Sequence, residues 1–305
     1  MFGSKYNYDR FTRNVLLKDV ATHRFGGPQA GDKAPDFKVK SLDGETIQLS
    51  DFRGSQNVVL TFGSATCPAT AGSIRGLNQL YDEYSDDDVQ FLFAYVREAH
   101  PGDKLPAHRS DGDKKEAAEL LREEENIEMP ILVDDVDGRL HRKYGSMPNS
   151  TYIIDKSGRV AFRSQWTRPS RIQAALDELL DRQEETGDEH VIVRGGADNS
   201  VPMRYGLMYS HRALGRAGDS AVQDFKEAMG RSGRVALATS RVAEPLVLNP
   251  GKAFAGAAIA GGVIVAALLA GISLRQRRMA MRSPYDVPRP KRRERSTGEY
   301  EAVGI

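Results

Sequence analysis

The sequence contains very little cysteine, since Cys67 is the only one among 305 residues. This scarcity excludes an intramolecular disulfide framework and any zinc site built from several cysteines. If Cys67 is oxidised, the thiol that reduces it must come from another molecule. We therefore expect an external reductant of the thioredoxin or glutathione type, and we expect no metal and no organic cofactor.

An excess of charge of one sign is also lacking, because 43 basic and 42 acidic side chains nearly cancel. A balanced chain offers no overall field that would attract nucleic acid or acidic substrates, so no nucleic-acid partner is expected. Residues 1–30 are polar, and they lack both the apolar run of a secretory signal and the twin arginine of an export signal. We interpret residues 1–30 as a polar, partly ordered lead-in.

Strand and helix patterns alternate over residues 31–182, which predicts one α/β domain. Strands separated by helices favour a parallel pair, and the turn at 156–159 adds an antiparallel hairpin. The predicted strands are 47–49, 58–62, 89–96, 131–133, 151–155 and 160–163, and the predicted helices are 68–84, 113–125, 137–144 and 171–180. Residues 183–250 lose this alternation, and we interpret them as a helical linker that packs on the domain or on a partner.

Residues 253–274 form a long hydrophobic run without a charged side chain. At about 1.5 Å per residue, such a helix spans about 33 Å, close to the thickness of the hydrocarbon core of a bilayer. We therefore expect a single-pass C-terminal membrane anchor in contact with lipid, followed by a basic tail over residues 275–305. Small residues on part of this run, such as Gly256 and Ala260, suit the pairing of two helices in a homodimer.

Two signals for membrane sidedness disagree. The basic tail should stay in the cytoplasm, which would place Cys67 on the other side of the membrane. However, nothing upstream of the hydrophobic run is suited to export a folded domain, and translocation without a signal is the harder event. We therefore expect the domain on the cytoplasmic face; a helix lying in the membrane interface is the alternative.

Cys67 follows the apolar run Val58–Phe62 and a turn of small residues, and it precedes Pro68. Proline suits the first position of a helix, where its missing N–H leaves no bond unmade. The thiol is thus predicted at a helix N-terminus, where unpaired N–H groups and the helix dipole stabilise a thiolate. A thiolate is a nucleophile, so Cys67 is a candidate for redox or covalent chemistry, while a buried inert cysteine is the alternative.

Other polar residues are placed where they could assist the thiol. Glu98 and His100 follow a buried strand, and Cys67 follows another, so these residues are expected at one rim of the sheet. Imidazole titrates near neutrality, so His100 or His108 is a candidate proton donor, and Glu98 is a candidate to orient it. The alternative is that all three are polar residues at a strand end without a catalytic role.

Three further residues near the thiol have two interpretations each. The hydroxyl groups of Ser64 and Thr66 either form the turn or donate hydrogen bonds to the sulfur. Trp166, the only tryptophan, either packs in the core or lines a pocket for an aromatic substrate.

The segments 31–37, 49–54 and 58–60, in this order and spacing, resemble the redoxin (AhpC/TSA) branch of the thioredoxin superfamily. The resemblance covers residues 31–182 and implies a thioredoxin-like fold, a central mixed sheet flanked by helices. It also implies a cis-proline that faces the thiol, and Pro148 is at the matching place. The sequence Cys67-Pro68-Ala69-Thr70 lacks the second cysteine of Cys-x-x-Cys, which excludes ordinary dithiol exchange.

The stretch 62–68 resembles the active-site segment of the iodothyronine deiodinases, with Cys67 at the selenocysteine position. The segments 95–103, with Glu-Ala-His-Pro, and 106–110, with His-Arg-Ser, continue this resemblance. It implies an oxidoreductase whose thiolate attacks a halogenated or peroxide small molecule, and the hydrophobic run at 253–274 adds the expectation that this enzyme is anchored to a membrane. The expected catalytic residues are Cys67, Thr66, Glu98, His100 and His108, supported by Ser64 and Pro148. A one-Cys thiol peroxidase, for which Ser64 matches but Leu60 replaces the expected proline, and a non-catalytic interaction module are the alternatives.

Overall fold

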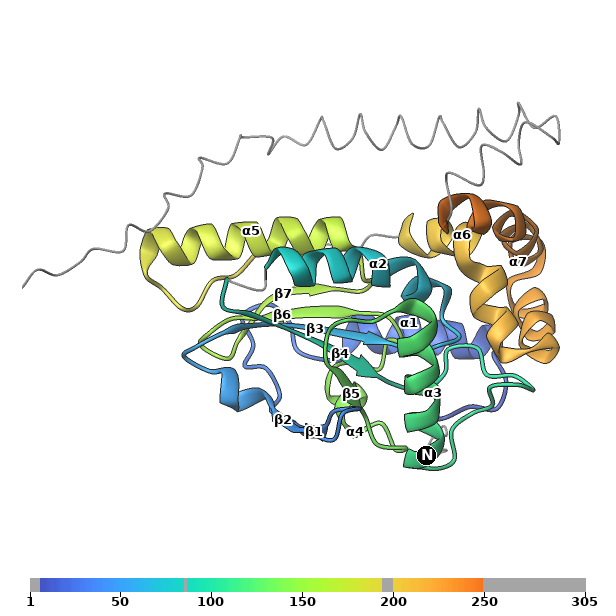
Figure 1. Ribbon diagram of the computed structural model, residues 1–305, viewed down its shortest axis with the longest axis horizontal. Coiled ribbons are helices and arrows are strands. Elements are labelled where there is room, and N and C mark those ends of the chain that lie inside the picture. Colours follow the sequence, from blue (N-terminus) through green and yellow to red (C-terminus); the bar gives the residue numbers. More distant parts are fainter. Residues whose placement is uncertain (1–5, 85–86, 194–199, 249–305) are drawn as a thin grey trace, which may run out of the picture. The chain divides into compact units, whose positions relative to one another are not determined.

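The central element is a five-stranded mixed sheet with the order β5-β4-β3-β6-β7 (Figure 1). The computed structural model describes residues 6–84, 87–193 and 200–248. The strands of this sheet are β3 (Asn57–Gly63), β4 (Val89–Tyr95), β5 (Ile131–Val133), β6 (Thr151–Ile154) and β7 (Val160–Ser164). Strands β3, β4 and β5 run parallel, whereas β6 and β7 are antiparallel. The predicted thioredoxin-like α/β fold with a mixed sheet is confirmed.

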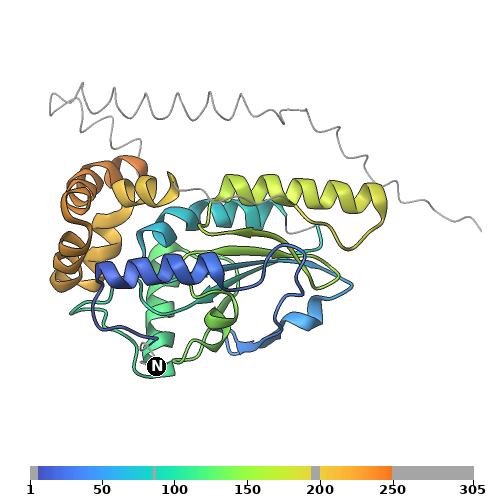
Figure 2. The same cartoon turned by 180° about the vertical axis from the view of Figure 1, so that it is seen from behind.

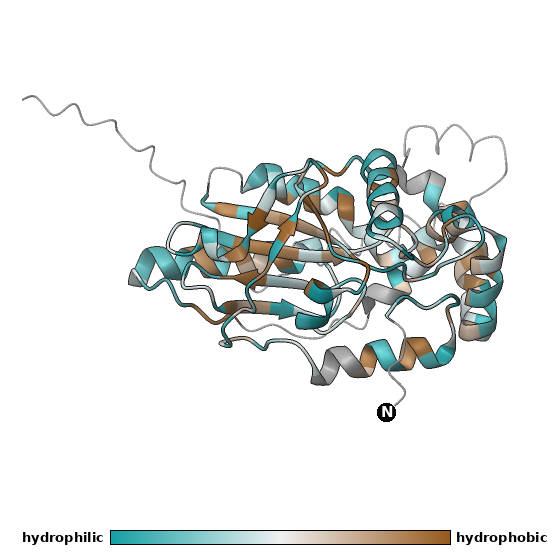
Figure 3. Cartoon of the chain, turned by 90° about the horizontal axis from the view of Figure 1, so that it is seen from below, coloured by the Kyte–Doolittle hydropathy of each residue, from teal (hydrophilic) through white to brown (hydrophobic). Residues whose placement is uncertain are grey.

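Strands β3 and β4 form the buried centre of the sheet, as their apolar sequences predict. All seven residues of β3 are buried, and the strands that are most hydrophobic lie in the middle of the domain (Figure 3). The parallel register pairs Val59 with Phe91 and Gly63 with Tyr95. Because both strands end at the same level, the loops that carry Cys67 and His100 leave the sheet side by side.

Helices cover both faces of the sheet (Figure 1). In chain order they are α1 (Arg13–Phe25), α2 (Pro68–Glu83), α3 (Asp111–Glu125), α4 (Arg139–Lys143), α5 (Pro169–Thr186), α6 (Ser200–Ala217) and α7 (Asp219–Leu248). Helices α2 and α5 bury Ile74, Leu77, Ile172 and Leu176 against one face, whereas α4 lies on the other. The second face is also covered by the short hairpin β1 (Lys38–Lys40) and β2 (Thr46–Gln48) and by the 3-10 turn η1 (Leu49–Phe52).

Two segments outside the predicted domain pack onto it. Helix α1 lies within the region expected to be a polar lead-in, and Figure 2 shows it next to α6 and α7. A separate apolar cluster joins Phe11 to Leu214, Phe225 and Ala236 of these two helices. The helical segment after residue 182 therefore packs on the domain, and the compact unit continues to Leu248.

Helix α6 approaches α2 closely because α2 carries a glycine at the contact. A Cβ atom added to Gly72 would lie 2.5 Å from Cδ1 of Tyr205 and 2.9 Å from Cδ2 of Tyr209. These distances are far below van der Waals contact, so the absence of a side chain at Gly72 allows both tyrosine rings to rest on α2.

In the described part of the chain, none of the helices has both the length and the apolar character needed to cross a membrane. The predicted anchor at 253–274 and the basic tail at 275–305 lie outside the described residues.

The Gly72 contact predicts a specific cost in stability. Gly72→Ala should lower the free energy of unfolding by about 1–3 kcal/mol, because the added methyl group overlaps the ring of Tyr205. Gly215→Ala on α6 is the matched control: a Cβ there meets no described heavy atom within 4 Å, so alanine should stabilise the helix by about 0.5–1 kcal/mol. Urea unfolding measures both, and equal effects of the two substitutions would contradict the proposed contact.

Candidate active site

Cys67 is the N-cap of α2, as the sequence predicts. Its backbone is extended (φ −89°, ψ 116°), and Pro68 begins the helix. The thiol is only 4% exposed, and it packs with Ala69, Ala99, Trp166 and Tyr205. The sulfur therefore lies between the start of α2, the loop after β4 and the side chain of an α6 residue.

The environment of Cys67 does not favour the thiolate, contrary to the expectation from its place at a helix N-terminus. Burial raises the pKa of the thiol, and the negative charge of Glu98 raises it further. The backbone amides of Thr70 and Ala69 and the hydroxyl of Thr70 act in the opposite direction. Burial has the larger effect because a charged sulfur loses its hydration there, so in this conformation the thiol is protonated at neutral pH.

Thr70 is a functional candidate that the sequence analysis missed. The hydroxyl groups considered there were those of Ser64 and Thr66, but Thr70 is the one that stabilises the sulfur anion. Two signals could have found it. Thr70 is the third residue of α2, a position whose amide faces the N-cap side chain, and it stands where Cys-x-x-Cys proteins have their second sulfur.

Ser64 and Thr66 instead tie the loop after β3 to the loop after β4. The hydroxyl oxygen of Ser64 accepts a hydrogen bond from the amide of Ala99 (3.2 Å), and that of Thr66 accepts one from the amide of His100 (2.9 Å). Both residues are fully buried. These bonds fix the chain on either side of Cys67 relative to the segment Glu98–His100.

A buried carboxylate, Glu98, lies at the centre of the site. Its Oε2 accepts hydrogen bonds from the amide (2.9 Å) and the hydroxyl (2.6 Å) of Thr66, and its Oε1 accepts one from the hydroxyl of Tyr95. Nε2 of His108 lies 3.4 Å from Oε1, without hydrogen-bond geometry. Burial alone would raise the pKa of Glu98, but the facing His108 and the hydrogen bonds outweigh it and hold the pKa below its ordinary value.

The structure thus brings Glu98 together with His108 rather than with His100. The ring of His108 is buried, and within the described residues neither of its nitrogens makes a hydrogen bond. The ring of His100 packs against two phenylalanines, 4.2 Å from the ring of Phe11 and 5.3 Å from that of Phe225. Burial lowers the pKa of His100 to about 3, so its imidazole is neutral and is not an acid at neutral pH.

The expected cis-proline is not found. No peptide bond of the described residues is cis, so the bond before Pro148 is trans. Ser146 adopts a left-handed conformation (φ 57°) and turns the chain ahead of Pro148, so the turn into β6 does not require a cis bond. The segment still reaches the site, because Nδ2 of Asn149 lies 3.5 Å from the hydroxyl oxygen of Thr70 and Oδ1 accepts from the amide of Thr167.

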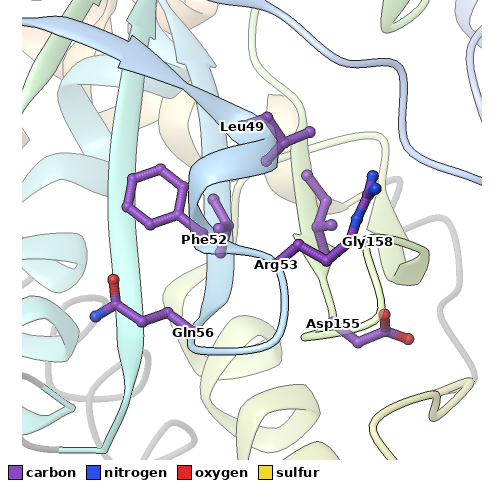
Figure 4. A pocket seen from close by; sticks show the side chains of 8 residues that line it. Leu49, Phe52, Arg53, Gln56, Asp155 and Gly158 are labelled. Atoms are coloured by element: carbon purple, nitrogen blue, oxygen red, sulfur yellow. The ribbon is translucent and has the colours of Figure 1, made fainter.

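A small pocket elsewhere in the domain contains none of these residues. Leu49, Phe52, Arg53 and Gln56 line it together with the end of β6 and the following turn (Figure 4). In the described ranges, no three histidine, cysteine, aspartate or glutamate side chains come together as metal ligands. The candidate active site is the arrangement around Cys67, in which Thr66 joins the thiol loop to Glu98 and Glu98 faces His108.

Comparison with known proteins identifies relatives of this arrangement. The AhpC/TSA family matches residues 30–163. Thyroxine 5-deiodinase of Gallus gallus is 32% identical over 43% of this chain and 55% of its own length, and type I iodothyronine deiodinase of Xenopus laevis is 30% identical over 54% and 67%. Thiol-disulfide oxidoreductase ResA of Bacillus cereus is 27% identical over 50% of this chain and 78% of its own length. The chain therefore spans between about half and two thirds of the length of the two deiodinases.

The role of Thr70 predicts a shift in the ionisation of Cys67. Thr70→Val removes the hydroxyl that stabilises the anion, so the pKa of the thiol should rise further, while Thr70→Ser should keep it. The pH dependence of alkylation by iodoacetamide measures this pKa without interference, because the chain has no other cysteine. Identical midpoints for the valine and serine variants would rule out a contribution of the hydroxyl.

Proposed function

The chain belongs to the thioredoxin-fold AhpC/TSA family, and from this premise we propose that it is a thiol-dependent oxidoreductase of the deiodinase-like type. Its membership, from a match over residues 30–163, bears out the resemblance to the redoxin branch. The observation that carries the proposal is a single buried arrangement, in which Thr66 joins the loop of Cys67 to Glu98 and Glu98 faces His108. A nucleophile, a carboxylate and an imidazole are the groups that a proton-coupled attack by sulfur requires.

In the proposed reaction, the Cys67 thiolate attacks the halogen of an aryl halide. A sulfur–halogen bond forms, the carbon–halogen bond breaks, and the carbon keeps the electron pair and takes up a proton. An external thiol then attacks Cys67, halide leaves, and a mixed disulfide forms with release of a proton. A second external thiol reduces this disulfide and regenerates Cys67. The organic product is reduced by two electrons, and two thiols are oxidised to a disulfide.

His108 is the proposed proton donor, with Glu98 as the group that orients it. Its Nε2 lies 3.4 Å from Oε1 of Glu98, so the carboxylate is placed to orient the ring. His100 was the other candidate, but its ring packs against Phe11 and Phe225, whereas the ring that faces Glu98 is that of His108. Thr66 is assigned to position Glu98, and Ser64 to position the segment before His100. The turn that contains Pro148 supports Thr70 through the side chain of Asn149.

An external reductant is favoured over dithiol exchange within the chain. Thr70 stands at the position of the second cysteine, so no internal thiol can resolve an oxidised Cys67. The relative named thiol-disulfide oxidoreductase ResA therefore supports the fold and the use of a thiol, but it is not a guide to the catalytic cycle of this chain.

Halide release tests the proposed reaction. With an iodinated phenol and excess dithiothreitol, Cys67→Ser should abolish iodide release, and His108→Asn should slow it about 10²–10³-fold because proton transfer is lost. His190→Asn is the matched control, since His190 is paired with Asp155 outside the site and should not change the rate. Absence of iodide release, together with dimedone labelling of Cys67 after peroxide, would replace this proposal with a one-Cys thiol peroxidase.

The location of the protein is a separate proposal that rests on residues 253–274. We expect these residues to anchor the chain to the membrane, with the thiol domain on the cytoplasmic side. The full chain should remain in the membrane pellet after alkaline carbonate extraction. Val265→Arg combined with Leu268→Arg should release it, because each charge at the centre of a span costs about 2.5–3.5 kcal/mol. Extraction of the unchanged chain by carbonate would contradict an anchor, and protease resistance of the domain in intact cells checks its side.

A further inference from the structure

The chain covers its own candidate active site with two segments that lie outside the sequence region of the family match. One is residues 6–11, and the other is the helical hairpin α6–α7; together we call them the cover. Cys67, His100 and His108 are all buried, with exposed fractions of 4%, 7% and 4%. A substrate cannot reach a sulfur buried to this degree unless part of the structure moves.

The hairpin forms one half of the cover. Tyr205 of α6 packs against the buried cluster of Cys67, Ala69 and Ala99, and its ring also rests on Gly72 of α2. Arg216 donates a hydrogen bond to the carbonyl oxygen of Ala65 (2.9 Å) and forms ion pairs with Glu124 and Glu125 of α3. Because this guanidinium is itself buried, these contacts fix α6 to the domain.

Residues 6–11 form the other half. The hydroxyl of Tyr8 donates a hydrogen bond to the carbonyl oxygen of Ala99 (2.8 Å), the residue that packs on the thiol. Burial raises the pKa of Tyr8, and the nearby sulfur adds to this rise, as expected for two groups whose negative charges would repel. Phe11 covers the ring of His100 at 4.2 Å.

The two halves meet above His100, where an ion pair joins them. Phe225 of α7 also contacts the ring of His100, at 5.3 Å, and stacks with Phe11 at 6.3 Å, so the three rings form one cluster. Next to these rings, Nε of Arg10 donates to both carboxylate oxygens of Asp224, at 3.0 and 3.1 Å. The Asp224 side chain is 4% exposed while that of Arg10 is 65% exposed, so the ion pair can separate by movement of the arginine into water.

We propose that the Arg10–Asp224 ion pair closes the cover over Cys67 and that the thiol becomes accessible only when residues 6–11 separate from the α6–α7 hairpin. The closed state is a resting state with a buried, protonated thiol. Separation hydrates the sulfur and removes the desolvation that opposes its ionisation. The role of the cover in catalysis rests on the proposed function. Its closure, in contrast, is measured by the reactivity of Cys67 without any substrate.

The test uses alkylation of Cys67 in the full chain, where a single cysteine reports without background. Arg10→Gln should increase the alkylation rate about tenfold. This factor lies between those expected for the loss of an exposed ion pair and of a buried ion pair, because only the Asp224 side chain of this pair is buried. The increase should be larger for a bulky maleimide than for iodoacetamide. Each variant is assayed above its own alkylation midpoint, so that a faster rate reports access rather than ionisation.

Two further variants make the result decisive. Glu178→Gln is the control, because it breaks an arginine–carboxylate ion pair outside the cover, with Arg182 of the same helix α5, and should leave the rate unchanged. The exchange of charges, Arg10→Asp with Asp224→Arg, should return the rate toward that of the unchanged protein. A rate for Arg10→Gln equal to that of Glu178→Gln would overturn the proposal, and so would a charge exchange that fails to restore slow alkylation. Iodide release does not enter this measurement, so a failure here leaves the proposed reaction to its own test.

Discussion

The site depends on one buried charge, the carboxylate of Glu98. A carboxylate removed from water must have its lone pairs satisfied, and here Thr66 and Tyr95 supply three hydrogen bonds while His108 faces the same group. Because Thr66 directly precedes Cys67 and Tyr95 ends β4, the need to satisfy this one group brings the nucleophile loop, a central strand and an imidazole into a fixed arrangement. The parallel register of β3 and β4 makes this possible by ending both strands at the same level.

Two opposing effects act on the ionisation of the Cys67 thiol, and their balance decides whether the sulfur is protonated. The amides at the start of α2 and the Thr70 hydroxyl favour the anion, as the position of Cys67 predicts. Burial among Ala99, Trp166 and Tyr205 favours the neutral thiol and outweighs them. The same burial keeps His100 neutral. Both groups therefore have the protonation states of a closed, dry site, and both would gain hydration on exposure.

The sequence was sufficient for the features that depend on local pattern. The apolar runs predicted the strands of the central sheet, and the proline after Cys67 predicted the start of α2. Features that depend on contacts between distant segments could not be predicted from the sequence. Helix α1 has a weakly amphipathic sequence and packs through distant partners, since Val15 and Leu16 contact the cluster with α6 and α7 and Asp19 pairs with Arg97, so its pattern alone gave no reason to expect a helix. The burial that raises the pKa of Cys67 also involves a distant segment, because Tyr205, which packs against the cluster around the thiol, lies 138 positions along the chain. The position of Thr70, in contrast, was visible in the sequence.

The packing of the hairpin on α2 has a consequence for dissecting the protein. The region that matches the family ends at residue 163, and the alternating pattern ends near residue 182, so a fragment cut there would seem a natural unit. Such a fragment would lose Val191 and Val193 from the main core, Tyr205 from the thiol and Arg216 from the carbonyl oxygen of Ala65. The borders of the region that matches the family and the borders of the compact unit therefore do not coincide in this chain, and a recombinant fragment that retains the native environment of the sulfur has to include the α6–α7 hairpin.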